Sequence, residues 1–196
     1  MKISVILGHP KKGSFNHAIA ETVVQTLRTR GHETVFHDLC QEAFDPLLPD
    51  VEMPKGAVLP PQIARHCSEI AAADGIVIVH PNWWGQPPAI VKGWVDRVIR
   101  PGVAYEFRDG DGGEGVPVGL LKAKAALVFN TSNTPAKREQ DVFGDPLERI
   151  WKDCVFGLCG VKNVHRSTFC VIVTSGEGER ARWLQDVRAT VTRYFP

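Results

Sequence analysis

The stretch VILGHPKKGSFNHAIA, residues 5–20, joins an apolar run to a new periodic pattern through a short basic turn. The run KISVILGH at residues 2–9 is rich in β-branched side chains and carries no charge inside it, which is typical of a strand buried on both faces. After Ser14, apolar side chains recur every four residues, which predicts a helix whose buried face carries Phe15, Ile19, Val23 and Leu27. A buried strand that leads directly into a helix is the opening unit of a parallel α/β sheet.

The same alternation of strands and helices continues to the end of the chain. Apolar runs predict further strands at residues 32–39, 75–81, 124–133 and 164–173. Periodic segments predict helices at residues 61–74, 88–99 and 147–158 and from residue 178 onward, and aperiodic stretches predict loops at residues 40–60 and 108–119. Five strands that alternate with five helices predict one doubly wound α/β domain over residues 1–196, with a five-stranded parallel sheet and helices on both faces.

Charge and cysteine content exclude several classes of protein. The 23 basic and 22 acidic residues give a net charge of +1, which argues against a nucleic-acid or membrane-surface protein. The five cysteines form no Cys-x-x-Cys pair and show no metal-ligand spacing, so we expect no metal site and free, mostly buried thiols in a reducing cytoplasm. No apolar run reaches the roughly 20 residues that a membrane helix needs.

Three of the predicted strands end in turns with unusual residues, namely GHPKKGSFN at residues 8–16, HPNWWGQPP at residues 80–88 and FNTSNTP at residues 129–135. Ligands of such sheets bind outside the carboxyl ends of the strands. The first turn lacks the lysine of a nucleotide-triphosphate loop, because Ser14 follows Gly13. Ser14 either caps the helix or, together with free backbone N–H groups, holds a phosphate.

The other two turns leave similar alternatives open. The adjacent indoles of Trp83 and Trp84 either cover a core or form an apolar wall for a flat ligand. The hydroxyls and amides of residues 130–135 form an ordinary turn or face the edge of a heterocycle. His9 and His80, at strand ends, are either structural groups or proton donors, so the sequence names no catalytic residue.

Together the motifs GHP…GSFN, HPNWWGQPPAIVKGWVDRV and AYEF resemble the flavodoxin-like NAD(P)H:quinone oxidoreductases. This family includes DT-diaphorase, modulator of drug activity B and the ancillary flavoproteins of potassium efflux systems. The resemblance spans most of the chain and is most specific at residues 81–98. It implies a flavodoxin-like fold and a homodimer with a flavin at each of two interface sites.

The resemblance also implies a role for each matching residue. The flavin phosphate end would be held by His9, Ser14, Phe15 and Asn16. The isoalloxazine would be lined by Pro81, Asn82, Trp83, Trp84 and Gly85, and its pyrimidine side would be reached by Thr131, Ser132 and Asn133. Tyr105 and Phe107 would cap the substrate pocket of the partner subunit.

One segment departs from the mammalian-type relatives, which carry a tyrosine and a histidine after the fourth strand. Here Phe143 takes the histidine's place, and Lys137 or Arg138 falls near the tyrosine's. A cation there either stabilises an anionic reduced flavin or is a solvated surface charge.

The function implied by the resemblance is a cytoplasmic flavoenzyme that takes a hydride from NADH or NADPH and passes two electrons to a quinone or a similar flat acceptor. FMN is the expected cofactor because no separate adenylate motif is visible, and FAD stays open. The alternatives are a regulatory flavoprotein subunit that docks on a potassium-efflux-type transporter, a flavodoxin-like electron carrier, and a flavin-free phosphate-binding domain.

Overall fold

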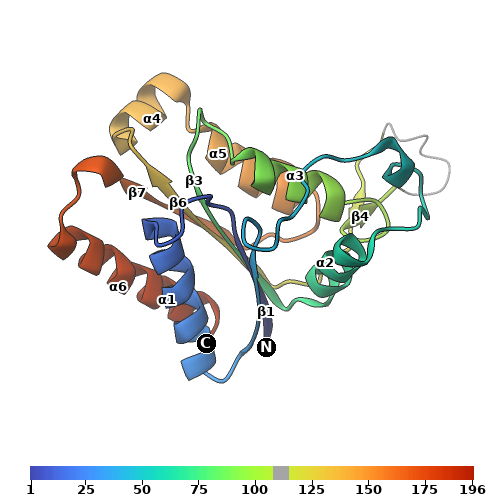
Figure 1. Cartoon of the computed structure of the whole chain (residues 1–196), viewed down its shortest axis with the longest axis horizontal. Coiled ribbons are helices and arrows are strands. Elements are labelled where there is room, and N and C mark those ends of the chain that lie inside the picture. The colour runs from blue at the N-terminus through green and yellow to red at the C-terminus, as the bar shows by residue number, and fades with distance from the viewer. Residues whose placement is uncertain (108–114) are drawn as a thin grey trace.

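The centre of the structure is a five-stranded parallel sheet with the order β2–β1–β3–β6–β7 (Figure 1). The computed structural model describes residues 1–107 and 115–196. The five strands are β1 (Lys2–Leu7), β2 (Glu33–Asp38), β3 (Gly75–Pro81), β6 (Ala125–Ser132) and β7 (Val164–Cys170). The predicted doubly wound sheet is confirmed. The strand order reverses beside β1, which places the expected ligand crevice at the ends of β1 and β3.

Helices cover both faces of the sheet (Figure 1). One layer is formed by α1 (Phe15–Thr29) and α6 (Glu177–Tyr194), and the other by α2 (Pro61–Ala72), α3 (Ala89–Val98) and α5 (Pro146–Arg149) with η2 (Ile150–Gly157). Side chains of β3 alternate between the layers, because Val77 and Val79 pack toward α1 whereas Ile76 and Ile78 pack toward α3. Burial on both faces explains why these strands are continuous apolar runs.

Three segments differ from the sequence-based expectation. A sixth helix, α4 (Ala136–Phe143), follows β6, and its single buried residue is Glu139, so it lacks the apolar period that predicts a helix. The predicted loop at residues 40–60 contains the short 3-10 helix η1 (Asp50–Glu52). The predicted strand at residues 164–173 ends earlier, and η3 (Ile172–Thr174) follows it.

The predicted surface loop at residues 108–119 is only partly described. Residues 108–114 lie outside the described residues, and β5 (Val118–Gly119) pairs antiparallel with β4 (Tyr105–Glu106). The loop expectation is therefore wrong for residues 118–119. None of the described helices is both long enough and apolar enough to cross a bilayer.

Glycine permits a close approach between helix α3 and the first turn. A Cβ atom on Gly8 would lie 2.0 Å from Cγ2 of Val91, so no larger residue fits there. The N–H of Gly8 also donates to the carbonyl of Val79 at 3.0 Å. These contacts bring the turns after β1 and β3 together at one edge of the sheet.

Candidate active site

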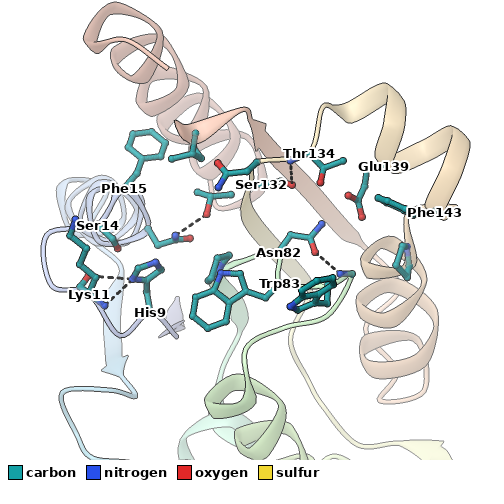
Figure 2. Close-up of a pocket in the computed structure, with 18 of the residues that line it drawn as sticks. His9, Lys11, Ser14, Phe15, Asn82, Trp83, Ser132, Thr134, Glu139 and Phe143 are labelled. Atoms are coloured by element: carbon teal, nitrogen blue, oxygen red, sulfur yellow. Dashed lines mark hydrogen bonds between the residues drawn. The ribbon is translucent and has the colours of Figure 1, made fainter. Parts of the chain in front are cut away.

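A cavity of about 780 Å³ opens at the carboxyl edge of the sheet, above β1, β3 and β6. It brings together all twelve residues that the family resemblance implies for the flavin: His9, Ser14, Phe15, Asn16, Pro81, Asn82, Trp83, Trp84, Gly85, Thr131, Ser132 and Asn133. Figure 2 shows labelled side chains from all three turns around this cavity. Its lining also includes residues that the sequence analysis did not single out as site residues: Lys11, Gly13, Thr134, Glu139, Phe143, Pro146, Ile172 and Arg180.

The end of the cavity beside α1 is positively charged. Ser14 is the N-cap of α1, and its Oγ accepts the N–H of His17, so capping and pocket lining are combined in one residue. The helix dipole adds partial positive charge at this point. Lys11 lines the same end, and the guanidinium of Arg180 lies 5.8 Å from the centre of the Phe15 ring. This end therefore favours an anion.

The wall of the cavity is a two-residue turn that presents two indoles. The backbones of Trp83 and Gln86 exchange hydrogen bonds of 3.1 and 3.0 Å, and Trp84 and Gly85 both have positive φ, as a type I′ turn requires. The Oδ1 of Asn82 accepts the N–H of Gly85 at 3.0 Å and fixes the turn. Trp84 is fully exposed and Trp83 is 44% exposed, so these indoles do not cover a core.

The floor beneath this wall is held by a neutral histidine. His80 is fully buried, and its Nδ1–H donates to the carbonyl of Pro81 at 2.8 Å. Its Nε2 accepts from the indole N–H of Trp151 at 2.9 Å and from the amide of Asn130 at 3.0 Å. Burial lowers the pKa of His80 to about 4. His80 is therefore a structural group that orients the turn after β3.

His9 differs from His80 because it reaches the cavity. Its Nδ1 accepts the backbone N–H of Lys11 at 3.1 Å, and its ring centre lies 6.2 Å from that of Trp83. Burial lowers the pKa of His9 below its usual value. A neutral His9 with its proton on Nε2 follows from these contacts.

The third turn ties the other two together. The amide of Asn16 donates to Oγ1 of Thr131 at 2.9 Å, and the backbone N–H of Asn82 donates to the carbonyl of Thr131 at 2.7 Å. Ser132 Oγ accepts the N–H of Thr134 at 3.0 Å, which shapes the turn that enters α4. All three turns are thus joined directly by hydrogen bonds.

The end of the cavity beside α4 carries a carboxylate and an aromatic ring (Figure 2). Glu139 is 6% exposed, and Phe143 is 50% exposed. Neither Lys137 nor Arg138 lines the cavity: Lys137 pairs with Asp141 on the surface, and Arg138 stacks over the Phe143 ring at 5.4 Å. These contacts favour the solvated-charge alternative for the two cations and place a negative group at the cavity instead.

Two buried acceptors in the lining have no hydrogen-bond partner among the described residues. They are Oδ1 of Asn16 and Oε1 of Glu139. An unpaired buried acceptor costs about 1–3 kcal/mol, so such groups are normally satisfied. A flavin fits this donor and acceptor set, because its ring N–H and ribityl hydroxyls are donors and its phosphate is an anion for the α1 end.

The two predicted substrate-pocket residues lie outside this cavity. Tyr105 and Phe107 form an edge-to-face pair with ring centres 6.0 Å apart. Burial raises the pKa of Tyr105, so its phenol is protonated at neutral pH. Phe107 is 38% exposed. Neither residue lines the cavity of its own chain, and their role toward a partner subunit stays a prediction.

A second group of polar residues, the histidine cluster, consists of His37, Glu42, His66 and Glu69. Its first three members have the composition of a metal site, because each offers a ligand atom within 4.8 Å of the others. His37 contacts Glu42 at 2.8 Å and Glu69 at 2.7 Å, and Nε2 of His66 donates to Glu42 at 3.2 Å. The indole N–H of Trp94 donates to Nδ1 of His66 at 3.1 Å. Nε2 of His66 therefore holds its proton and is not a free metal ligand.

The cysteines give no further chemical centre. All five are free, with Cys67 and Cys159 buried and Cys154 exposed. Burial raises the pKa of Cys159 to about 11, which keeps its thiol protonated and unreactive. The expectation of mostly buried thiols is wrong for Cys154, Cys40 and Cys170, of which the last two are partly buried.

Comparison with known proteins places the chain in a family. The family described as a flavodoxin-like fold matches residues 1–191. A Haemophilus influenzae protein named "Uncharacterized NAD(P)H oxidoreductase" is 32% identical over 169 residues, which cover 84% of this chain and 81% of that protein. The chain belongs to the flavodoxin-like NAD(P)H:quinone oxidoreductase family. The resemblance derived from the motifs is thereby confirmed.

Another relative carries a quinone reductase name. NAD(P)H dehydrogenase (quinone) 1 of Rattus norvegicus is 31% identical over 122 residues, which cover 53% of this chain and 44% of that protein. The chain therefore matches less than half the length of this relative. Since both named relatives are oxidoreductases, the transporter-docking alternative gains no support.

Solved structures share the fold over nearly the whole chain. The NAD(P)H:quinone oxidoreductase of Methanothermobacter marburgensis has a TM-score of 0.82 and 24% identity, with 97% of this chain and 95% of that chain covered. An FMN-dependent NADH-azoreductase of Bacillus anthracis, solved in complex with FMN, has a TM-score of 0.78 and 15% identity, with 98% and 99% covered. These likenesses show the fold.

Proposed function

We propose that the chain is a flavin-dependent NAD(P)H oxidoreductase that binds FMN in the 780 Å³ cavity and passes two electrons to a quinone or a similar flat acceptor. The observation that carries this proposal is the convergence of three turns on a cavity with a cationic end, an exposed aromatic wall and two buried acceptors that have no partner among the described residues. The names of the relatives support the same class of reaction.

In this proposal the residues of the chain bind and orient the cofactor. The α1 N-terminus, Lys11 and Arg180 hold the anionic phosphate. Trp83 and Trp84 shield one border of the ring from water, and Asn16 and Glu139 accept hydrogen bonds from donors of the ligand. When bound, the flavin supplies the redox chemistry by accepting a hydride from NADH or NADPH and releasing two electrons to the acceptor.

No side chain of the cavity acts as an acid or base in this proposal. His80 is buried beneath the floor, and its nitrogens are occupied by Pro81, Asn130 and Trp151. His9 borders the cavity as a neutral ring. The chain therefore contributes position and electrostatics, as is usual for enzymes whose cofactor performs the chemistry.

The test is an absorbance spectrum of the purified protein, followed by chromatography of the released pigment and turnover assays. The proposal predicts a flavin spectrum, release of FMN, and oxidation of NADH or NADPH that depends on an added quinone. Release of FAD would keep the enzyme class and replace the cofactor. Colourless protein that binds no added flavin would contradict the proposal.

We further propose that the active form is a homodimer in the cytoplasm. Tyr105 and Phe107 lie outside the cavity of their own chain, and Phe107 is partly exposed, so they are placed to reach a second subunit. The five free cysteines suit a reducing compartment. Sedimentation of the flavin-loaded protein as a monomer, with full quinone turnover, would contradict the shared pocket.

A further inference from the structure

A row of three hydrogen-bonded side chains, those of Ser14, His17 and Asp38, leads away from the cationic end of the cavity. The Oγ of Ser14 lies 2.8 Å from Nδ1 of His17, and Nε2 of His17 lies 3.1 Å from Oδ2 of Asp38. His17 is 8% exposed and Asp38 is 6% exposed. Ser14 is the only member of the three that lines the cavity. This row of side chains thus connects the proposed phosphate site to a buried carboxylate at the end of β2.

The contacts of Asp38 decide which nitrogen of His17 carries a proton. Oδ1 of Asp38 accepts the backbone N–H groups of Cys40 and Gln41, both at 3.2 Å. Oδ2 faces Nε2 of His17, and a carboxylate only accepts hydrogen bonds. Nε2 of His17 therefore carries its proton. A neutral His17 then has only a lone pair on Nδ1.

With this tautomer of His17, the hydroxyl of Ser14 has to donate its single proton to Nδ1. Since Nδ1 of a neutral His17 only accepts, the 2.8 Å contact is filled by the hydroxyl proton of Ser14. The Oγ also accepts the backbone N–H of His17 at 3.4 Å. The side that Ser14 turns to the cavity then offers a lone pair. A phosphate oxygen also offers only lone pairs, so the two would repel each other.

We propose that His17 is a positioning residue for anion binding: it takes up one proton on Nδ1 when a phosphate group enters the cavity, and this frees the hydroxyl of Ser14 to donate to the phosphate. The proton comes from solvent, and no covalent bond changes except that new N–H bond. Ser14 keeps its own proton and turns it from Nδ1 to a phosphate oxygen. The resulting imidazolium lies between Ser14 and the carboxylate of Asp38. This inference rests on the proposed function, because it needs the flavin phosphate at this end of the cavity.

The charged and titratable groups around His17 are consistent with that uptake. His9, on the turn before α1, lies edge-on to His17 with ring centres 6.2 Å apart, and burial lowers its pKa, so it is neutral and does not oppose a second charge. Asp38 faces His17 from the end of β2. The backbone N–H of Cys40 donates to Asp38, and burial raises the pKa of the Cys40 thiol, so that thiol carries no charge and Asp38 is the anion of that side. Lys11 of the same turn is exposed. Asp38 therefore stabilises an imidazolium at His17.

The test is calorimetric titration of flavin-free protein with FMN near pH 8, in two buffers with different ionisation enthalpies. The phosphate of FMN is already a dianion there, because its second pKa is about 6. We expect uptake of up to one proton for each FMN bound, and an FMN Kd that weakens by up to tenfold for each unit by which the pH rises. Riboflavin, which lacks the phosphate, should bind to the same protein without this uptake.

Two variants test the tautomer argument separately. In Asp38→Asn the new amide donates to Nε2 of His17, so a neutral ring carries its proton on Nδ1. In His17→Asn an amide N–H replaces Nδ1–H at every pH. In both, we expect proton uptake close to zero and a flat pH dependence of the FMN Kd, with riboflavin affinity kept.

The outcomes separate this inference from the proposed function. Equal proton uptake in the wild-type protein and in both variants would overturn the role of His17 while leaving FMN binding intact. Failure of FMN to bind at any pH would overturn the proposed function itself. If Asp38→Asn does not fold, His17→Asn alone still distinguishes the two outcomes.

Discussion

The cavity and the histidine cluster differ in how far their polar groups are satisfied. In the histidine cluster, His66 accepts from Trp94 and donates to Glu42, and His37 is paired with Glu42 and Glu69. In the cavity, buried acceptors of Asn16 and Glu139 have no partner among the described residues, and an indole is fully exposed. Among the residues that the structure describes, the first arrangement satisfies its own polar groups, and the second does not.

The difference shows that residue composition alone does not identify a site. Histidines and carboxylates suggest a metal centre, yet their own hydrogen bonds occupy the atoms that would bind it. The cavity has ordinary residue types, yet two of its buried acceptors lack a partner within the described part of the chain and its two indoles are exposed, which is the pattern expected of a ligand site. Four variants or conditions can break or sharpen this contrast.

Low pH should give the largest effect on stability, because it protonates histidines whose hydrogen bonds require the neutral ring. The pKa of His80 and that of His66 are both held at about 4, below the usual 6.5, mainly by burial. The unfolded chain binds more protons than the folded one between these values, so the free energy of unfolding falls as pH falls from 6.5 toward 4. The titration of His80 alone should lower the free energy of unfolding by about 3 kcal/mol at pH 4. Urea unfolding across this window measures the loss.

The control for this prediction is His80→Gln, which removes one titrating group and keeps a donor for Pro81 and an acceptor for Trp151. As the pH falls from 6.5 toward 4, the free energy of unfolding of this variant should decrease less steeply than that of the wild-type protein. The difference in slope should correspond to about one proton fewer taken up on unfolding. A wild-type stability that stays constant down to pH 4.5 would contradict the buried neutral histidines.

Ser14→Asp should weaken FMN binding by about 100-fold, because it places a negative charge beside the phosphate. Aspartate is as good an N-cap as serine, so the free energy of unfolding should stay within about 0.5 kcal/mol of the wild type. Fluorescence titration with FMN and urea unfolding give the two numbers. Undiminished FMN content in the purified variant would show that the phosphate does not bind at this end of the cavity.

Glu42→Ala should act on the histidine cluster alone. It leaves His66 and His37 without one acceptor each, which should lower the free energy of unfolding by about 2 kcal/mol. The FMN Kd should stay within about twofold, since Glu42 does not line the cavity. A chelator should leave the thermal midpoint of the wild-type protein unchanged. If the chelator destabilises the protein as much as the substitution does, the cluster holds a metal.

Trp84→Ala should weaken FMN binding by about tenfold and leave the free energy of unfolding unchanged, because the indole is fully exposed and packs against no core residue. Trp151→Ala is the matched comparison: this buried indole should cost about 3–5 kcal/mol of stability. Equal FMN affinity in Trp84→Ala and the wild-type protein would show that the wall assignment is wrong.

Much of the architecture can be predicted from the sequence, because strands that are buried on both faces have continuous apolar sequences. The strand at Gly75–Pro81 is buried throughout, and its predicted bounds match those of the structure. The twelve implied site residues meet in one cavity because carboxyl ends of parallel strands meet at one edge. Their role in holding a flavin stays a prediction.

Other parts could not be predicted, because their cause lies in three-dimensional packing. Glu139 belongs to helix α4, of which it is the one buried residue, so no apolar periodicity in the sequence predicts this helix. Arg180 reaches the cavity from α6, far along the chain, only because α6 packs beside α1. The histidine cluster joins β2, the turn after it and α2, and its members have no characteristic spacing in the sequence.

The most direct test of the central claim is a crystal of the protein soaked with FMN. The account predicts a tricyclic ring bordered by Trp83 and Trp84, with its phosphate at the N–H groups that begin α1 and its ring N–H or hydroxyl donors on Asn16 or Glu139. Density for water alone in the cavity, at a saturating FMN concentration, would contradict it.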